Sequence, residues 1–386
     1  MRVLFSFVGG NGHFQPLVPI IEAAHDAGHT ILVACTHDMY ETVHKAGFPS
    51  YVFASATQQA QIVEKTPLQP VDRRREENDL RELFARQVAR KRAPKIIQLC
   101  EEWKPDLIVC DEVDFGSMIA AEFLGIPHAS VVVIASGSFI RPDVVAEPLD
   151  EIRAKYGLEP DPKLKMLSHH LLIVPVPARF RDPAYPLPTT AHVIQPFALK
   201  TPRFLKPFDD YDETRPTLYF TLGTVFNTES GDLFARVLRA LQRVQANVIV
   251  TVGKHINPLE FGEQADHIYI TQYIPQLDVL PHCDLAISHA GSGTVIGCLA
   301  HGVPMVLIPM GADQINNAER CEALGIAQIL DVMDATSDMI YQAITTTLAN
   351  PQFREATQRF KAEIQALPEP ASVIPLLERL MSQHNT

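Results

Sequence analysis

The sequence is short of basic residues, and it has no long apolar run. Its 386 residues include 33 lysines and arginines against 45 aspartates and glutamates, which gives a formal net charge of −12 at pH 7. Nucleic acids and anionic membranes bind basic surfaces, so this balance argues against both as partners. No uninterrupted apolar stretch approaches the ~20 residues that a membrane-spanning helix needs. The N-terminal segment MRVLFSFVGG is typical of a first β-strand and not of a signal peptide. We therefore expect a cytoplasmic protein.

Paired cysteine motifs and metal-ligand clusters are also missing. No two cysteines have a Cys-x-x-Cys spacing, and no His, Cys, Asp and Glu residues cluster at metal-ligand spacing. Scattered cysteines are typical of buried or partly buried free thiols in a reducing compartment. We expect all the cysteines to be free thiols, and we expect no metal cofactor. The cysteines are Cys35, Cys100, Cys110, Cys283, Cys298 and Cys321.

The length and the order of sequence patterns predict two α/β domains. A chain of 386 residues is too long for one ordinary core and suits two domains of ~150–200 residues. In the first half, short β-branched runs alternate with helical patterns, which predicts parallel βαβ units and a doubly wound sheet. The predicted strands of this half are 2–8, 30–35, 50–53, 107–110 and 130–134, and the predicted helices are 16–27, 38–46 and 115–124.

A change of composition separates the two halves. Residues 174–216 are rich in proline and charge, which is typical of a domain end followed by a linker. The alternation then restarts, with predicted strands at 217–221, 247–252, 267–271, 285–288 and 304–308 and helices at 230–244 and 294–301. The predicted division is a first domain at 1–200, a linker at 201–215, a second domain at 216–368 and a C-terminal helix at 369–386, for which a return to the first domain is one option.

Two stretches of the first half do not fit the alternation. Residues 54–103 include Gln/Ala-rich, charged and proline-containing segments, and the charged run 72–77 is typical of a solvated face or a mobile loop. Residues 136–165 are similarly irregular. Long insertions in a compact α/β domain are often functional, so both stretches are candidates to frame a binding cleft.

The segment 273–325 has the pattern of an anion site. A predicted strand ends at His289, and the turn Ala290-Gly291-Ser292-Gly293-Thr294 opens a helix. The first N–H groups of such a helix, together with the positive end of its dipole, suit a diphosphate. His289, Ser292 and Thr294 add side-chain donors. An ordinary strand-to-helix turn, with Thr294 as a cap, would account for the same residues.

A second polar group follows the next predicted strand. Asp313 and Gln314 stand at the carboxyl end of a parallel strand, where doubly wound folds bind ligands. A carboxylate beside a carboxamide suits the vicinal hydroxyls of a sugar. Helix capping by Asp313 is the alternative interpretation.

These motifs together resemble the donor-binding signature of the family 1 glycosyltransferases, and the pattern is most similar to their bacterial natural-product members. The signature runs in order through Pro-Gln, His-x-Gly-x-Gly-Thr, Gly-Val-Pro-Met-Val and Asp-Gln-x-x-Asn-Ala. Residues 9–16 match the family's Gly-His-x-x-Pro element, and residues 221–224 resemble its phosphate-contacting loop. The resemblance implies a GT-B fold, with two Rossmann-like doubly wound parallel-sheet domains facing across a cleft. It also implies a glycosyltransferase of the hexosyltransferase type, with an acceptor-binding first domain and a nucleotide-sugar-binding second domain.

The resemblance assigns a role to each donor-side residue. It implies that Asp313 and Gln314 bind the sugar hydroxyls and that Asn317 lies near the diphosphate and the sugar. Tyr273 would stack on the pyrimidine base, and Ile274 and Gln276 would flank the base and the pentose. The residues that would hold the diphosphate are Thr224, His289, Gly291, Ser292, Gly293 and Thr294.

One departure from the family's plant signature bears on the nucleotide. A Glu that grips both ribose hydroxyls in the plant enzymes is replaced here by Gly297. A 2′-deoxyribose has no 2′-hydroxyl to grip, so Gly297 favours a dTDP-deoxysugar, with a UDP-hexose as the alternative donor.

The resemblance also implies a general base. His13 would deprotonate the acceptor, and Asp111 would fix the imidazole tautomer and stabilise the imidazolium. Inverting displacement at the anomeric carbon follows from this arrangement. The alternative interpretations are a polar helix-start residue for His13 and a strand-end cap for Asp111, and some bacterial members of the family use an acidic residue elsewhere.

Other functions on the same fold stay open at this point. A 2-epimerase, a cell-wall GlcNAc transferase and a non-catalytic sugar-nucleotide-binding protein are the alternatives, and a nicotinamide oxidoreductase is disfavoured because no Gly-x-Gly-x-x-Gly follows the first strand. The resemblance implies a small hydrophobic acceptor without identifying it. The bond made, to oxygen, nitrogen or carbon, and the choice between monomer and homodimer stay open too.

Overall fold

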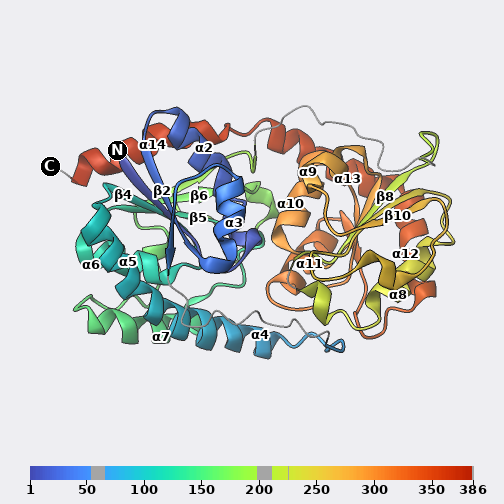
Figure 1. Ribbon diagram of the computed structural model, residues 1–386, viewed down its shortest axis with the longest axis horizontal. Helices are drawn as coiled ribbons and strands as arrows, with labels where there is room; N and C mark the ends of the chain where they lie inside the picture. The colour runs from blue at the N-terminus through green and yellow to red at the C-terminus, as the bar shows by residue number, and fades with distance from the viewer. Residues whose placement is uncertain (54–65, 198–210, 225, 385–386) are drawn as a thin grey trace. The chain divides into compact units, whose positions relative to one another are not determined.

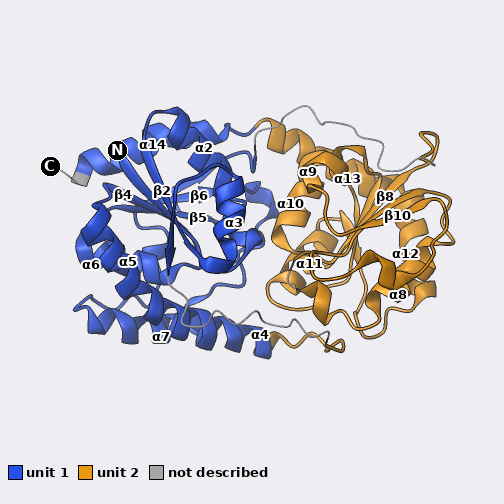
Figure 2. Cartoon of the chain, in the orientation of Figure 1, with its two compact units in different colours: residues 1–59, 74–198, 367–386 blue, residues 60–73, 199–366 orange. Residues whose placement is uncertain are grey.

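The computed structural model describes residues 1–53, 66–197, 211–224 and 226–384. The chain divides into two compact units (Figure 2). Unit 1 comprises residues 1–59, 74–198 and 367–386, and unit 2 comprises residues 60–73 and 199–366. The C-terminal segment thus belongs to unit 1, and a short segment from the first half of the chain belongs to unit 2.

Unit 1 is built on a parallel sheet of seven strands in the order β3-β2-β1-β4-β5-β6-β7 (Figure 1). The strand order reverses between β1 and β4, which makes this pair the topological switch point of the sheet. The strands are β1 (Arg2–Ser6), β2 (Thr30–Thr36), β3 (Ser50–Phe53), β4 (Leu107–Asp111), β5 (His128–Val131), β6 (Leu171–Val174) and β7 (Ala191–Val193).

The helices of unit 1 connect these strands. They are α1 (Asn11–Phe14), α2 (Val18–Asp26), α3 (His37–Lys45), α4 (Arg73–Asp79), α5 (Ala89–Trp103), α6 (Phe115–Leu124), α7 (Pro142–Lys155) and α14 (Ile374–His384). A π-helix (Leu80–Val88) joins α4 to α5, and 3₁₀ turns occur at Lys165–Leu167, Ala178–Phe180 and Pro370–Val373.

Unit 2 repeats the plan with six parallel strands in the order β10-β9-β8-β11-β12-β13. Its switch point lies between β8 and β11. The strands are β8 (Thr217–Thr221), β9 (Asn247–Thr251), β10 (Ile268–Thr271), β11 (Leu285–Ser288), β12 (Met305–Leu307) and β13 (Ala327–Ile329). The helices are α8 (Leu233–Leu241), α9 (Gln276–Val279), α10 (Ser292–His301), α11 (Gln314–Ala323), α12 (Ser337–Ala349) and α13 (Pro351–Gln365), with 3₁₀ turns at Phe226–Glu229, Pro258–Phe261 and Leu280–His282.

The central strands are apolar because helices cover both faces of each sheet. β4, β8, β9 and β11 are buried at every residue, and β1 is buried from Val3 onward. The expected free thiols are confirmed, since all six cysteines are buried and none forms a disulfide. Among the described residues, no helix is long and apolar enough to cross a membrane.

The prediction that residues 54–103 and 136–165 are irregular is wrong for most of the described residues. Residues 73–103 form one continuous helical stretch, and α7 occupies Pro142–Lys155. Glu, Arg, Leu and Ala, which occur in both stretches, are strong helix formers. They were not recognised as helical because the stretches do not fit the alternation of strands and helices. Each helix also contains a proline, Pro94 in α5 and Pro148 in α7. The part of the first stretch at 54–65 lies outside the described residues.

The charged run 72–77 is a solvated face over residues 72–75, as one of the two expectations had it, and not a mobile loop. α4 begins inside it at Arg73, and its charges form ion pairs, Arg73 with Glu319, Arg75 with Glu76, and Glu77 with Arg141. β6, β7 and β13 are not among the predicted strands, and prolines dominate the surroundings of β7. β7 is a three-residue strand at the edge of the sheet, where proline is tolerated.

Candidate active site

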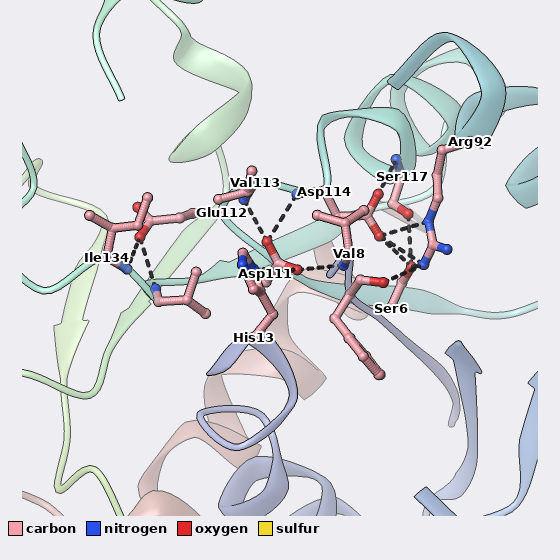
Figure 3. Close-up of polar contacts among 12 residues, drawn as sticks. Ser6, Val8, His13, Arg92, Asp111, Glu112, Val113, Asp114, Ser117 and Ile134 are labelled. Atoms are coloured by element: carbon pink, nitrogen blue, oxygen red, sulfur yellow. Dashed lines mark hydrogen bonds and ion pairs between the residues drawn. The ribbon is translucent and has the colours of Figure 1, made fainter. Parts of the chain in front are cut away.

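The switch point of unit 1 holds His13 and Asp111 (Figure 3). His13 lies in the short helix α1 that follows β1, and Asp111 is the last residue of β4, the neighbour of β1 in the sheet. The Nδ1 atom of His13 lies 3.5 Å from Oδ2 of Asp111. The His13 side chain is 25% exposed, whereas Asp111 is fully buried. A histidine at the surface is thus paired on one nitrogen with a buried carboxylate.

Backbone amides fix the Asp111 carboxylate in place. Oδ2 accepts a hydrogen bond from the N–H of Val8 at 2.8 Å. Oδ1 accepts from the N–H groups of Val113 at 2.6 Å and Asp114 at 3.0 Å. Three donors on the loops after β1 and β4 therefore orient the carboxylate toward His13.

A buried ion pair lies beneath this carboxylate. Arg92 of α5 contacts Asp114 at 3.1 Å, and Asp114 caps α6 by accepting from the N–H of Ser117. Ser6, at the end of β1, donates to Asp114 at 2.6 Å and accepts from Arg92 at 2.8 Å. Every member of this network has a hydrogen-bonding partner. The network therefore holds β1, α5 and α6 together behind the switch point.

Glu112 points away from both groups, as Figure 3 shows. Its Oε1 accepts from the N–H groups of Val133 at 2.8 Å and Ile134 at 2.7 Å. Burial raises the pKa of Glu112 to about 7, although the charge of Arg181 opposes the rise. Glu112, Asp114 and Arg92 are not among the site residues predicted from the sequence. The run Asp111–Asp114, with three acids directly after a buried strand, was the signal that could have found the first two.

The predicted donor residues of unit 2 follow three adjacent strands. Thr224 follows β8, His289 follows β11 and Asp313 follows β12, and the register pairs the ends of β8 and β12 with the end of β11. Carboxyl ends of parallel strands meet at one edge of the sheet, so these residues share the edge at which doubly wound folds bind ligands.

His289 is buried at this edge, with glycine on both sides. A Cβ atom at Gly223 would lie 2.6 Å from Nε2 of His289, and one at Gly291 would lie 2.5 Å from it. Only glycine leaves room for the imidazole at these two positions. Burial lowers the pKa of His289 to about 4, although a hydrogen bond with the backbone of Thr221 acts in the opposite direction. The imidazole is therefore neutral at cellular pH.

Helix α10 opens directly after His289. Gly291 is its N-cap, and the first intrahelical hydrogen bond runs from the N–H of Val295 to the Gly291 carbonyl at 3.0 Å. The N–H groups of Ser292, Gly293 and Thr294 therefore precede the helical ladder, at the positive end of a ten-residue helix.

A hydrogen-bond network joins this turn to the start of α11. Ser292 donates to Oδ2 of Asp313 at 2.7 Å. The carboxamide of the fully buried Asn317 donates to Asp313 at 2.8 Å, to Ser292 at 3.0 Å and to the Ala290 carbonyl at 3.1 Å. The network holds Asp313 and the α10 turn in one arrangement.

Two predicted glutamines are held by neighbouring groups. Oε1 of Gln314 accepts from the N–H groups of Met310 at 2.8 Å and Gly311 at 3.2 Å, which fixes the orientation of its carboxamide. Gln276 donates to Oγ1 of Thr294 at 3.0 Å and so links α9 to the first turn of α10.

The predicted base-binding residues lie between β10 and α9. Tyr273 is 66% exposed, and Ile274 is half-buried. At Gly297, inside α10, a Cβ atom would lie 2.8 Å from Cδ1 of the buried Leu280. Leu280 therefore occupies the space beside Gly297.

Comparison with protein families shows two matching models. The erythromycin biosynthesis protein CIII-like N-terminal domain matches residues 22–139, and the C-terminal domain of the same family matches residues 235–380. Together they cover more than half of the chain, and each falls largely in one unit.

Individual proteins resemble the chain over its full length. It is 24% identical to the aclacinomycin-T 2-deoxy-L-fucose transferase of Streptomyces galilaeus, covering 100% of this chain and 97% of that protein. It is 27% identical to the L-demethylnoviosyl transferase of Streptomyces niveus, covering 94% and 97%. Among solved structures, spinosyn rhamnosyltransferase SpnG complexed with thymidine diphosphate superposes with a TM-score of 0.79 at 22% identity, covering 98% of this chain and 100% of that one. This likeness confirms the predicted GT-B fold.

Proposed function

The chain belongs to the erythromycin biosynthesis protein CIII-like family of bacterial natural-product glycosyltransferases, and we propose that it transfers a deoxysugar from dTDP to a small hydrophobic aglycone with inversion at the anomeric carbon. The relatives named for 2-deoxy-L-fucose and L-demethylnoviose transfer support a deoxysugar donor. The observation that carries the proposal is the pairing of His13 with the buried, backbone-held Asp111 at the switch point of unit 1. A protein that only binds nucleotide sugars has no use for that pair.

The donor diphosphate binds at the start of α10. The N–H groups of Ser292, Gly293 and Thr294, with the helix dipole, supply positive potential to the diphosphate. The neutral imidazole of His289 and the hydroxyl of Thr224 add donors. Asp313 and Gln314 hydrogen-bond to the sugar, and Asn317 positions Asp313 and Ser292 from behind.

The nucleotide is dTDP in this proposal because Gly297 carries no carboxylate for a ribose. Leu280 occupies the neighbouring space, so a longer side chain at 297 needs Leu280 to move. The thymidine diphosphate in a SpnG structure supports the same choice. Tyr273 stacks on the base as an exposed aromatic platform, flanked by Ile274 and Gln276.

The chemistry is a single displacement. His13 takes the proton of the acceptor hydroxyl, and the oxygen attacks the anomeric carbon opposite the departing dTDP. One C–O bond forms as the other breaks, which inverts the configuration. Asp111 stabilises the imidazolium that results. The leaving group's charge is absorbed by the N–H groups of α10, a preorganised electrostatic site that needs no metal.

Product analysis tests the proposal. The protein is incubated with dTDP-L-rhamnose and a panel of macrolide and anthracycline aglycones, with and without EDTA, and the products are analysed by mass spectrometry and NMR. We expect a glycoside of inverted anomeric configuration, in equal yield with and without EDTA. A product of retained configuration, or one that depends on metal, would contradict the mechanism.

A further inference from the structure

Unit 1 contains a cavity that the proposed reaction does not explain. It encloses about 240 Å³ between the ends of β4 and β5, β6 and the segment that follows β6. Ile134, Ile140 and Leu172 contribute apolar wall, and Glu112 and Arg181 contribute charged groups. Glu112 directly follows Asp111, so the cavity lies on the β5 side of the switch point that holds the proposed base.

The guanidinium of Arg181 is buried in this cavity without sufficient acceptors. Its Nε and Nη1 atoms are inaccessible to solvent, and neither has a hydrogen-bond partner among the described residues. Burial lowers the pKa of Arg181 against the charges of Glu112 and Asp182, which raise it. An arginine does not lose its proton in proteins, so the cost of burying these donors persists until an acceptor arrives.

The backbone is shaped to hold the guanidinium in this position. The N–H of Asp182 donates to the Ser136 carbonyl at 2.9 Å, which brings the Arg181 segment beside Gly137. Gly137 has a φ of 76°, and a Cβ atom there would overlap the guanidinium carbon of Arg181. The close approach of charge to backbone therefore requires glycine at 137.

Glu112 does not supply the missing acceptor. Its Oε1 already accepts from the N–H groups of Val133 and Ile134. The carboxyl is not within hydrogen-bonding distance of Nε or Nη1 of Arg181. Because its pKa is about 7, a substantial fraction is uncharged at neutral pH. Of the charged residues that line the cavity, Arg181 and the exposed Lys163 are basic and Glu112 is acidic, so positive charge exceeds negative charge even when Glu112 is ionised.

We propose that this cavity binds a carboxylate carried by the sugar acceptor, with Arg181 as its partner. The inference rests on the proposed function, because it assigns the cavity to the acceptor of that reaction. Arginine donors match the planar acceptor geometry of a carboxylate. A volume of about 240 Å³ is below the ~300–1,000 Å³ of sites that enclose a whole drug-sized ligand. The cavity therefore takes one ring or one arm of the acceptor and selects aglycones that bear an acid.

Binding of a matched pair of small probes tests this assignment. 2-Naphthoate and its neutral analogue 2-naphthamide are titrated calorimetrically into the full-length protein. We expect 2-naphthoate to bind at least tenfold more tightly than 2-naphthamide. Arg181→Met should abolish that preference, and Arg179→Met should keep it, because Arg179 is exposed two residues away and does not line the cavity. Equal binding of the two probes to the wild-type protein, or an unchanged preference in Arg181→Met, would overturn the inference.

A second variant covers the case in which Arg181→Met does not fold. Ile140→Trp fills the cavity and leaves the arginine in place, so it should reduce 2-naphthoate affinity at least tenfold. Retained affinity in this variant would also overturn the inference. Titration with dTDP in parallel reports on unit 2 alone. A protein that binds 2-naphthoate but not dTDP would refute the proposed donor site, and one that binds dTDP but does not discriminate between the probes would refute only the carboxylate site.

Discussion

Single residues decide the protonation states that the proposed reaction requires. His13 must be neutral before it accepts a proton, and Asp111 must be oriented before it can stabilise the charged product. Three backbone N–H groups orient Asp111. In unit 2, His289 is neutral for another reason, because it is buried between two glycines. The proposed function therefore gives the two histidines different tasks, proton transfer for His13 and hydrogen bonding for His289.

Replacing His13 with alanine should remove the base and leave the donor site intact. We expect kcat to fall by about 10²- to 10⁴-fold, the usual contribution of a general base, with dTDP affinity within twofold of the wild type. The measurements are product formation by mass spectrometry and dTDP titration by calorimetry. His37→Ala, an exposed histidine of the same unit, is the control and should keep full activity. Wild-type turnover in His13→Ala would show that another group is the base.

The glycines around His289 offer a test of its role that leaves the histidine itself in the chain. In Gly291→Ala, the added Cβ would displace the imidazole, and dTDP affinity should fall about 10- to 100-fold, the cost of one hydrogen bond to a charged group. His289→Ala should cause a similar loss. The double variant should lose little more than either single variant, because both act through one side chain. Fully additive losses would mean that Gly291 acts independently of His289.

Among the elements of unit 2, the turn between β11 and α10 is held in place by the side chain of a residue in the next helix, α11. Asn317 of α11 binds the Ala290 carbonyl, Ser292 and Asp313, and it is fully buried. The resemblance to known enzymes assigns Asn317 to the neighbourhood of the ligand. The hydrogen bonds indicate in addition that it positions the two elements on which the donor rests.

Removing this carboxamide should weaken both the fold and the donor site. Asn317→Ala leaves a buried carbonyl and the half-buried Asp313 carboxylate short of donors, so we expect the free energy of unfolding to fall by about 1–3 kcal/mol and dTDP affinity to fall at least tenfold. Asn350→Ala removes the cap of α13, a hydrogen bond to Gln352, for about 1 kcal/mol. That control should leave dTDP affinity unchanged. Urea denaturation and calorimetry measure the two quantities, and equal dTDP affinity in both variants would refute the positioning role.

The sequence was sufficient for most strands of the two sheets, but β6, β7 and β13 and the long helical stretch 73–103 were not predicted. Buried strands such as 107–111 and 285–288 stand out because an unbroken apolar run has few other interpretations. The helical stretch 73–103 was not predicted because its charged residues and Pro94 interrupt the helical spacing of its apolar residues. Arg92 and Arg181 could not be found from the sequence, because their roles arise from burial against partners far along the chain.

At the scale of the whole molecule, two doubly wound sheets divide the chemistry between them. The switch point of unit 1 holds the proposed base, His13, and the carboxylate of Asp111, and that of unit 2 holds the proposed anion site. The repeat of one topology explains why strand ends predicted both sites from sequence. The carboxylate site that we propose for the acceptor could not be predicted, because most of the residues that line the cavity come from segments with no recognisable pattern.

Acid should destabilise unit 2 through its buried histidine. The pKa of His289 is about 4 in the folded protein and ~6.5 in the unfolded chain. The unfolded state thus binds the proton more strongly, and stability falls as the pH drops from 6.5 toward 4. Between pH 7.5 and 5.0 this residue should account for about 2 kcal/mol of the loss.

Urea denaturation of the wild type and His289→Asn at both pH values measures that contribution. The variant should lose about 2 kcal/mol less than the wild type over this range, while His301, whose pKa burial also lowers to about 4, contributes equally to both. The same pH dependence in the two proteins would contradict a buried, neutral His289.

We propose that this chain is a transferase for dTDP-sugars, and the first experiment is calorimetric titration with dTDP and with UDP in the absence of added metal. We predict that dTDP binds and that UDP binds at least several-fold more weakly, because Gly297 offers no carboxylate to a ribose and Leu280 occupies the space beside it. Tighter binding of UDP would contradict the assignment of the nucleotide, and binding of neither would contradict the donor site itself.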